Sequence, residues 1–111
     1  MSKQRSKEEY VRLQTKYPYR IPIIISTTGS LKTPDKVKFL CPMSLTFAHF
    51  MVVLRKRLES LEPEEAIFAF VKNELVVSSQ LLSQIHAEHA ADDGFLDIIL
   101  TKENTFGMYV F

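Results

Sequence analysis

The order of predicted helices and strands is the feature that most constrains the fold of this chain. Runs of β-branched and aromatic residues predict strands, and apolar residues at helical spacing predict helices. Along the chain the order is helix, strand, strand, helix, strand, strand, helix and strand, which predicts an α+β domain built on one mixed sheet. The expected strands span residues 21–27, 36–41, 66–71, 75–77 and 95–101, and the expected helices span 6–16, 46–58 and 78–89.

Local signals refine this outline. Ser6 and Glu9 match a capping box, in which Ser6 caps the first helix and Glu9 reaches back to the Ser6 amide. Ser78 or Ser79 is expected to cap the last helix. Pro22, at the start of the first strand, argues against a central place for that strand, because proline cannot donate to a ladder. The pattern is that of a β-grasp fold with four to five strands, helices packed on the sheet and a short N-terminal helix. From that fold we infer that the first and last strands pair in parallel.

The length and composition restrict the class of protein. A chain of 111 residues suits one domain, which buries about 65% of its unfolded surface. No apolar run is long enough to cross a bilayer, and the polar start does not match a secretory signal. The only cysteine, Cys41, allows no intrachain disulfide. We therefore expect a reducing compartment, the cytosol by default.

The net charge is only +1, but the charge is unevenly distributed. Residues 1–58 carry twelve lysines and arginines against three acidic residues, a balance of +9. Residues 59–111 carry two lysines against ten acidic residues, a balance of −8. This asymmetry is expected either of a basic face that attracts acidic peptides, anionic lipid or nucleic acid, or of two solvated surfaces on one compact fold.

Four segments of the chain together resemble one family. The resemblance is to the autophagy ubiquitin-like modifiers, the family of GABARAP and microtubule-associated-protein light chain three. It extends from about residue 8 to residue 107 and implies a ubiquitin-like β-grasp domain that is a modifier, not an enzyme. The segments are Tyr17-Pro18 with Arg20-Ile21-Pro22-Ile23-Ile24, Asp35 to Pro42, Arg55-Lys56-Arg57-Leu58, and Asp93-Gly94-Phe95-Leu96 followed by Glu103-Asn104-Thr105-Phe106-Gly107.

The resemblance implies a role for the end of the chain. Glycine exposes the least hindered carbonyl, which suits both a narrow protease channel and a thioester. By match, Gly107 is the conjugation residue, the bond between Gly107 and Met108 is cleaved, and Phe106 is read by a processing cysteine protease. Activating and conjugating enzymes then carry the glycine to phosphatidylethanolamine on the autophagosome membrane. We accordingly expect a flexible N-terminus over 1–5, a domain over 6–107, and a removed tail over 108–111.

A second implied activity is peptide capture. An edge strand offers unpaired amides to an extended peptide, and residues 36–40 are the candidate, with side chains alternating between faces. The family binds aromatic-x-x-aliphatic motifs of cargo receptors in two pockets, and acidic residues flank those motifs. By match, the aromatic pocket is Leu13, Pro22, Ile24, Lys38, Leu40 and Phe95; the aliphatic pocket is Phe39, Cys41, Pro42, Phe50, Val53 and Leu54; the acidic-motif contacts are Lys36, Lys38 and Arg57. Without the resemblance, most of these apolar residues are predicted to be core.

The chain departs from the family in two places that we expect to be linked. Family members have two N-terminal helices, and about eight to ten leading residues have no counterpart here, so the first helix is expected to be absent or one turn long. Asp97 stands where the family usually has a tyrosine, on the strand face shared with Phe95 and Ile99 that the extension would cover. His86 replaces another usual tyrosine.

Rival chemistry has little support in the sequence. Cys41 is predicted to be a structural thiol, not a nucleophile. His86 and His89, with Asp92 and Asp93 nearby, lack a third ligand at a known spacing and are predicted to be solvated histidines rather than a metal site. No glycine loop for phosphate is present, and we expect no cofactor, no nucleic acid and a monomer. The remaining alternative is an unconjugated β-grasp adaptor that only binds peptide motifs.

Overall fold

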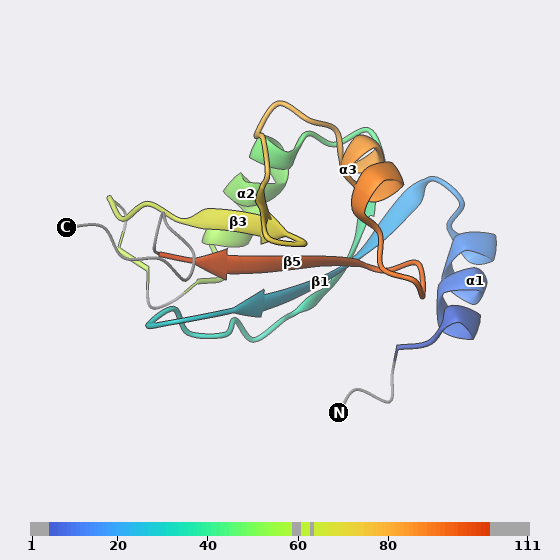
Figure 1. Ribbon diagram of the computed structural model, residues 1–111, viewed down its shortest axis with the longest axis horizontal. Coiled ribbons are helices and arrows are strands. Elements are labelled where there is room, and N and C mark those ends of the chain that lie inside the picture. The colour runs from blue at the N-terminus through green and yellow to red at the C-terminus, as the bar shows by residue number, and fades with distance from the viewer. Residues whose placement is uncertain (1–4, 59–60, 63, 103–111) are drawn as a thin grey trace.

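The computed structural model describes residues 5–58, 61–62 and 64–102, and its described strands form a five-stranded mixed sheet (Figure 1). The strand order is β2-β1-β5-β3-β4. The pair β1 and β5 is parallel, and the other three pairs are antiparallel. The predicted β-grasp order and the parallel pairing are therefore confirmed. The elements are α1 (Lys7–Lys16), β1 (Arg20–Thr27), β2 (Lys38–Pro42), α2 (Phe47–Arg55), β3 (Phe68–Val71), β4 (Glu74–Leu75), α3 (Leu82–His89) and β5 (Leu96–Thr101).

The core lies between one face of the sheet and two helices, α2 and α3. Side chains alternate between the two faces of a strand, and on β1 the residues Ile21, Ile23 and Ile25 point to this face, where all three are buried. Figure 1 shows α1 apart from these helices, at the end of the sheet where β1 and β5 begin. The core cluster is Ile21, Ile23, Ile25, Leu31, Phe47, Phe50, Leu54, Leu58, Ala69, Val71, Leu82, Ile85, Leu96, Ile98 and Leu100.

The prediction that Pro22 keeps β1 from the centre of the sheet is wrong. β1 lies between β2 and β5. Pro22 is opposite Leu40 in the antiparallel pair, and the parallel register with β5 begins one residue later, at Ile23 with Leu96. The proline therefore precedes the ladder that would have used its amide, and the missing donor costs no hydrogen bond there.

The last helix begins later than predicted. Neither Ser78 nor Ser79 caps it, because α3 starts at Leu82 with Leu81 as its N-cap. The preceding segment has another role, since the carbonyls of Ser78 and Gln80 accept hydrogen bonds from the first amides of α2 at 2.9 and 2.8 Å. These amides have no partner within their own helix, so the segment before α3 completes the start of α2.

Other boundaries differ by a few residues. The predicted N-cap is confirmed, because the Ser6 hydroxyl accepts the Glu9 amide at 3.1 Å. Expected strand residues 36 and 37 precede β2, which starts at Lys38, and β4 is reduced to two residues. The helix expected to reach Leu58 ends at Arg55 and continues as a tighter turn, in which the Leu58 amide bonds to the Arg55 carbonyl at 3.1 Å.

Candidate functional site

The free edge of β2 is the first component of the site. Among the described strands β2 pairs with β1 alone, so its other side is open. The Ile25 amide donates to the Val37 carbonyl at 2.8 Å, and the Met43 amide donates to the Tyr19 carbonyl at 3.0 Å. In each bond the two residues lie directly opposite each other, in the same antiparallel register as β1 and β2. Because bonded and non-bonded pairs alternate along such a ladder, they determine which β2 residues point outward.

Lys38 and Leu40 belong to the set whose backbone groups point away from β1. Each presents an amide and a carbonyl at the open edge, where an extended peptide can add as a further strand. Phe39, between them, is in the other set and bonds to β1. One outward group is already engaged, because Arg20 Nη1 donates to the Leu40 carbonyl at 3.2 Å.

A pocket of about 250 Å³ opens beside this edge and is lined by residues of α1, β1 and β2, together with Phe95 just before β5. All six residues predicted for the aromatic pocket line it. Phe95 is 3% exposed and Pro22 is buried, whereas Leu13, Ile24 and Leu40 are half-buried. A mostly apolar lining that includes two lysines suits an aromatic side chain with an acidic neighbour. The full lining is Glu9, Leu13, Pro22, Ile23, Ile24, Lys36, Lys38, Phe39, Leu40 and Phe95.

The residues predicted for the aliphatic pocket divide into two groups. Phe50 and Leu54 belong to the core, with 2% and 0% exposure. Val53 is 47% exposed, Pro42 is exposed, and Phe39 and Cys41 are half-buried. The rings of Phe39 and Phe50 meet edge to face, with centroids 5.7 Å apart. Phe50 therefore lies beneath Phe39, and the surface open to a ligand consists of Phe39, Cys41, Pro42 and Val53.

The three cations predicted to meet acidic residues border two different hollows. Lys36 and Lys38 both line the pocket beside β2. The Lys36 ammonium lies 5.5 Å from the centre of the Phe39 ring, a cation–π distance. Arg57 instead borders a separate hollow of about 160 Å³, with Lys32, Thr33, Pro34 and Asp35.

Cys41 is a half-buried thiol at the end of β2. Burial raises its pKa to about 11, although the charges of Arg20 and Lys36 act in the opposite direction. A thiol with a raised pKa is a poor nucleophile at neutral pH. The geometry therefore agrees with the prediction of a structural cysteine.

The histidines of α3 are engaged with other groups. His86 Nε2 donates to the Gly94 carbonyl at 2.7 Å, and His89 Nε2 lies 3.7 Å from a carboxylate oxygen of both Glu74 and Glu88. Over the described part of the chain, no group of three His, Cys, Asp or Glu side chains is arranged to hold a metal ion. The helices described there are too short or too polar to cross a membrane.

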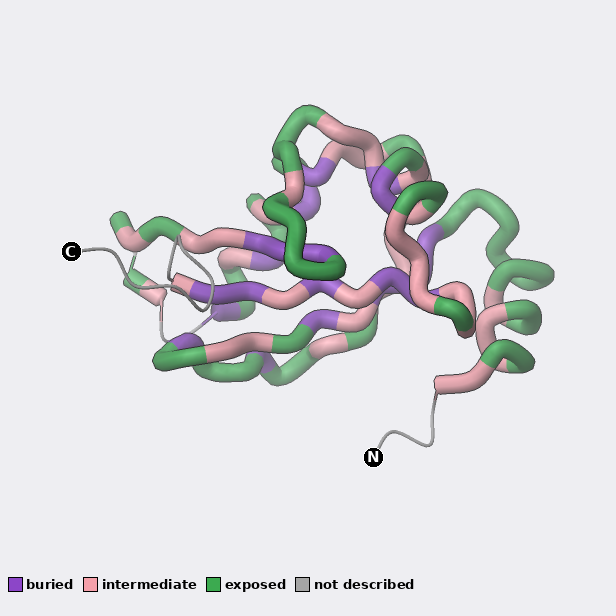
Figure 2. Tube along the Cα trace, in the orientation of Figure 1, coloured by how far each residue is buried: buried purple, intermediate pink, exposed green. Residues whose placement is uncertain are grey.

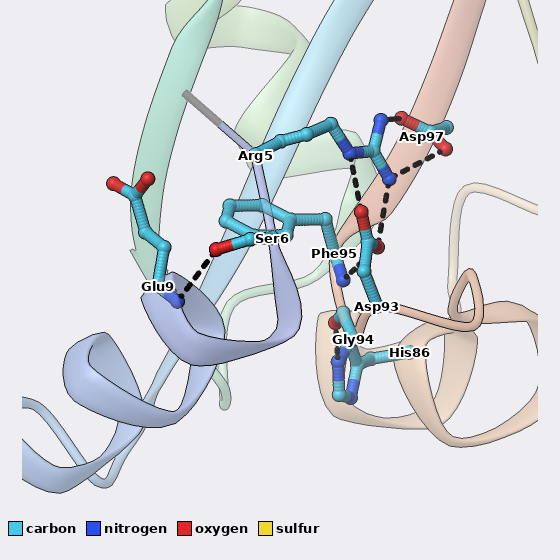
Figure 3. Close-up of polar contacts among 8 residues, drawn as sticks. All are labelled: Arg5, Ser6, Glu9, His86, Asp93, Gly94, Phe95 and Asp97. Atoms are coloured by element: carbon cyan, nitrogen blue, oxygen red, sulfur yellow. Dashed lines mark hydrogen bonds and ion pairs between the residues drawn. The ribbon is translucent and has the colours of Figure 1, made fainter. Parts of the chain in front are cut away.

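Arg5 forms a cluster that sequence reasoning did not find (Figure 3). Its Nε donates to Asp93 at 2.7 Å and its Nη2 at 2.9 Å, while Nη2 also lies 3.0 Å from Asp97. Nη1 makes a second bond to Asp97, so the guanidinium holds both carboxylates. We call this group the Arg5 clasp. The sequence signal that could have found it is Asp97 itself, an acidic residue on the strand face that the N-terminal extension is expected to cover.

The charges of the Arg5 clasp reinforce one another. The hydrogen bond from Arg5 is the main cause that holds the pKa of Asp93 below its usual range. The hydrogen bonds of Arg5 raise its own pKa, and the bond to Asp93 contributes more than the bond to Asp97. Arg5 also lies over the Phe95 ring, with its guanidinium carbon 5.3 Å from the ring centre. Arg5 thus keeps its contacts although it falls in the segment expected to be flexible.

The predicted processing site lies outside the described residues. β5 ends at Thr101, and Lys102 Nζ then lies 3.3 Å from a carboxylate oxygen of Glu65. Phe106, Gly107 and Met108 come after this point. Their assignment stays a prediction.

Comparison with known proteins points to one family. The profile of the family described as "Autophagy protein Atg8 ubiquitin like" matches residues 4–107. Autophagy-related protein 8b of Arabidopsis thaliana is 46% identical over 101 residues, which cover 89% of this chain and 82% of that protein. Autophagy-related protein 8 of Mycosarcoma maydis is 44% identical over 106 residues, covering 94% of this chain and 89% of that protein.

Solved structures agree with the sequence comparison. Trypanosoma brucei ATG8 has a TM-score of 0.81 and 33% identity, and the match covers 91% of this chain and 88% of that chain. Plasmodium falciparum Atg8 in complex with a Plasmodium falciparum Atg3 peptide has a TM-score of 0.79 and 27% identity, covering 87% of both chains. With a family match over most of its length and relatives above 40% identity, this chain belongs to the Atg8 family of ubiquitin-like autophagy proteins.

Proposed function

We propose that this autophagy protein is processed after Gly107, conjugated to phosphatidylethanolamine on autophagosome membranes, and recruits cargo receptors by capturing aromatic-x-x-aliphatic motifs along β2. The observation that carries the peptide-binding half is the open β2 edge directly beside an apolar pocket of about 250 Å³. The edge supplies backbone partners and the pocket supplies a place for one large side chain, which together define β-strand addition.

The mode of binding follows from the edge geometry. A peptide that lies along β2 pairs its backbone with the outward groups of Lys38 and Leu40. Its aromatic side chain enters the pocket over Phe95, and its aliphatic side chain lies about 10 Å further along, three residues away at strand spacing. That distance takes it toward the surface of Cys41 and Val53. Lys36 and Lys38 attract acidic residues that flank the motif.

Arg20 has a place in this binding mode. Its bond to the Leu40 carbonyl occupies an acceptor that the incoming peptide amide needs. The guanidinium is exposed and moves aside at little cost, because water replaces the lost partner.

The conjugation half of the proposal rests on the family and on the tail. The Phe106-Gly107 pair stands at the end of the segment that matches the family profile. The partners proposed are a processing cysteine protease and the activating and conjugating enzymes of the autophagy modifier pathway. The structure of Plasmodium falciparum Atg8 with an Atg3 peptide supports the idea that a member of this family contacts such partners through peptide segments. In this role the chain is a substrate of catalysis.

The first experiment is the intact mass of the protein recovered from its own cells, in soluble and membrane fractions. Loss of the mass of residues 108–111, together with a lipid adduct in the membrane fraction, is the expected result. An unprocessed mass in both fractions under starvation contradicts the conjugation half and favours the unconjugated adaptor.

A second experiment tests the groove independently of conjugation. Lys38→Ala combined with Leu40→Ala removes two side chains that line the aromatic pocket. We expect peptide binding to weaken by ~2 kcal/mol or more, the usual contribution of anchor positions. Calorimetric titration with a motif peptide measures this, with the same peptide lacking its aromatic residue as the control. An unchanged affinity removes the groove assignment.

A further inference from the structure

The helix α1 is attached to the rest of the domain with little buried surface. None of its ten residues is buried, and Figure 2 shows the helix without a buried segment. Its exposed face carries Lys7, Val11 and Arg12, and only Tyr10 and Leu13 offer large half-buried apolar surface toward the sheet. Hydrophobic contact alone therefore holds α1 weakly, because the area removed from water is small.

The Arg5 clasp lies at the N-terminal end of this helix, two residues before Lys7. Arg5, Asp93 and Asp97 are brought together across 88 and 92 positions of sequence, so the clasp ties the start of α1 to the start of β5. The guanidinium donates to both carboxylates, a geometry that is stronger and more directional than a single ion pair. Its side chain is 21% exposed, so water screens it only in part.

An aromatic layer continues from the clasp into the pocket. Tyr10 stacks on His86 with ring centres 5.9 Å apart, and it meets the Phe95 ring at 6.2 Å. Arg5 lies over the same Phe95 ring at 5.3 Å. Phe95 lines the aromatic pocket, and Leu13 of α1 is another part of that lining. The Arg5 clasp is thus connected to two residues that line the pocket. It contacts Phe95 directly through the aromatic ring, and it is linked to Leu13 through helix α1.

We propose that Arg5 is a positioning residue for peptide recognition, which, by clasping Asp93 and Asp97, holds α1 and the Phe95 ring in the places that shape the aromatic pocket. This inference rests on the proposed peptide-binding function. Arg5 itself does not contact the peptide. Loss of the Arg5 clasp is therefore predicted to weaken binding of the peptide's aromatic side chain. Binding of the aliphatic side chain, which lies over β2 and α2, is predicted to stay the same.

The test compares Arg5→Ala with Lys7→Ala, which removes the same charge from an exposed position two residues away. Calorimetry uses the full chain and three peptides: one with the motif, one with leucine in place of the aromatic residue, and one with alanine in place of the aliphatic residue. Removing Arg5 is expected to weaken binding of the motif peptide by about three- to tenfold, the usual range for a positioning substitution. Lys7→Ala is expected to leave it unchanged.

The pattern across peptides separates positioning from general loss of stability. In Arg5→Ala, the preference for the aromatic peptide over its leucine counterpart shrinks, while the preference for the aliphatic anchor stays as in wild type. Hydrogen exchange of the α1 amides becomes faster in the same variant. Arg5→Lys, which keeps one ion pair, restores part of the aromatic preference and serves as the readout if Arg5→Ala does not fold.

Each other outcome has a distinct meaning. If the wild type binds the motif peptide and Arg5→Ala binds it equally well, this inference is overturned and the proposed function stands. A uniform loss for all peptides also overturns it, because then Arg5 only maintains the fold. A wild type that binds none of the peptides overturns the proposed function and this inference together.

Discussion

Gly94 lies so close to Tyr10 that a Cβ atom on the glycine would stand 2.4 Å from two atoms of the tyrosine ring. Tyr10 belongs to α1, and Gly94 is in the turn that leads into β5. The backbone of Gly94 has a φ of +100°, a conformation that side chains disfavour. Close approach and backbone conformation thus both require glycine here, and the contact lets α1 reach the strand.

We expect Gly94→Ala to destabilise the fold by about 3 kcal/mol, from overpacking against the ring and from backbone strain. Urea unfolding measures the loss. Gly29→Ala is the matched control, because Gly29 also has a positive φ, +66°, but has no atom within 4 Å of the added Cβ. Only backbone strain remains there, so its expected cost is about 1 kcal/mol. Equal losses at the two glycines contradict a close contact with Tyr10.

The elements predicted most accurately are those whose signals are local. The Ser6 cap and the dense isoleucines of β1 depend on neighbouring residues and were predictable from sequence. The start of α3 was not, because Ser78 looks like a helix cap but uses its carbonyl to complete α2 across a long sequence separation. The position of β1 could not be predicted from Pro22 for a similar reason. Whether the missing amide of Pro22 costs a hydrogen bond depends on the register between β1 and β5, and that register is a property of the whole sheet.

The candidate site divides in the same way. The six residues that the resemblance assigns to the aromatic pocket line one pocket in the structure, and their role in binding peptide stays a prediction. Phe50 and Leu54, which the resemblance assigns to the aliphatic pocket, are buried in the core in this structure, because core packing cannot be told from pocket lining by sequence alone. The Arg5 clasp could not be predicted from the sequence, because pairing across 92 positions leaves no periodic pattern in the chain.

Cys41 should react slowly with thiol reagents at neutral pH. Its pKa of about 11 lies above that of a free cysteine, mainly through burial, so the reactive thiolate is scarce until the pH approaches that value. Alkylation by iodoacetamide from pH 7 to pH 10, followed by mass spectrometry, measures this against a cysteine-containing peptide. Bound motif peptide is expected to slow the reaction further, because Cys41 belongs to the open aliphatic surface. A reaction as fast as the free peptide's at pH 7 contradicts the buried environment.

The stability added by the Arg5 clasp should depend on pH in one direction. Because the pKa of Asp93 is lowered in the folded state, the carboxylate stabilises the fold above the usual aspartate pKa of about 4. That stabilisation is lost as the pH falls through the lowered value. We expect Arg5→Gln to cost about 1 kcal/mol at pH 7, the level of a partly exposed ion pair. The cost should shrink as the pH falls through the lowered pKa of Asp93, measured as the difference in unfolding free energy from wild type; a difference that stays constant from neutral to strongly acidic pH contradicts the ion pair.

Two adjacent valines on α2 provide a matched test of the aliphatic surface. Val52 and Val53 are 56% and 47% exposed, but only Val53 is assigned to peptide binding. We expect Val53→Ala to weaken motif-peptide binding by about 1.5 kcal/mol, since two methylene-sized groups leave the interface. Val52→Ala should have no effect. Calorimetric titration of both variants with the motif peptide measures this difference. If the two variants bind the peptide with equal affinity, the aliphatic side chain of the peptide does not lie on Val53.

Gly107→Ala should separate conjugation from peptide capture. The added methyl group hinders the carbonyl that must pass through the protease channel and form thioesters, and it restricts the backbone at the cleaved bond. We expect the variant to keep its full mass in cells and to form no lipid adduct, while its purified form binds motif peptide with wild-type affinity. Mass spectrometry of membrane fractions and calorimetry measure the two activities separately. A Gly107→Ala protein that is conjugated as efficiently as wild type contradicts the assignment of Gly107, and one that loses peptide binding as well contradicts the independence of the tail from the groove.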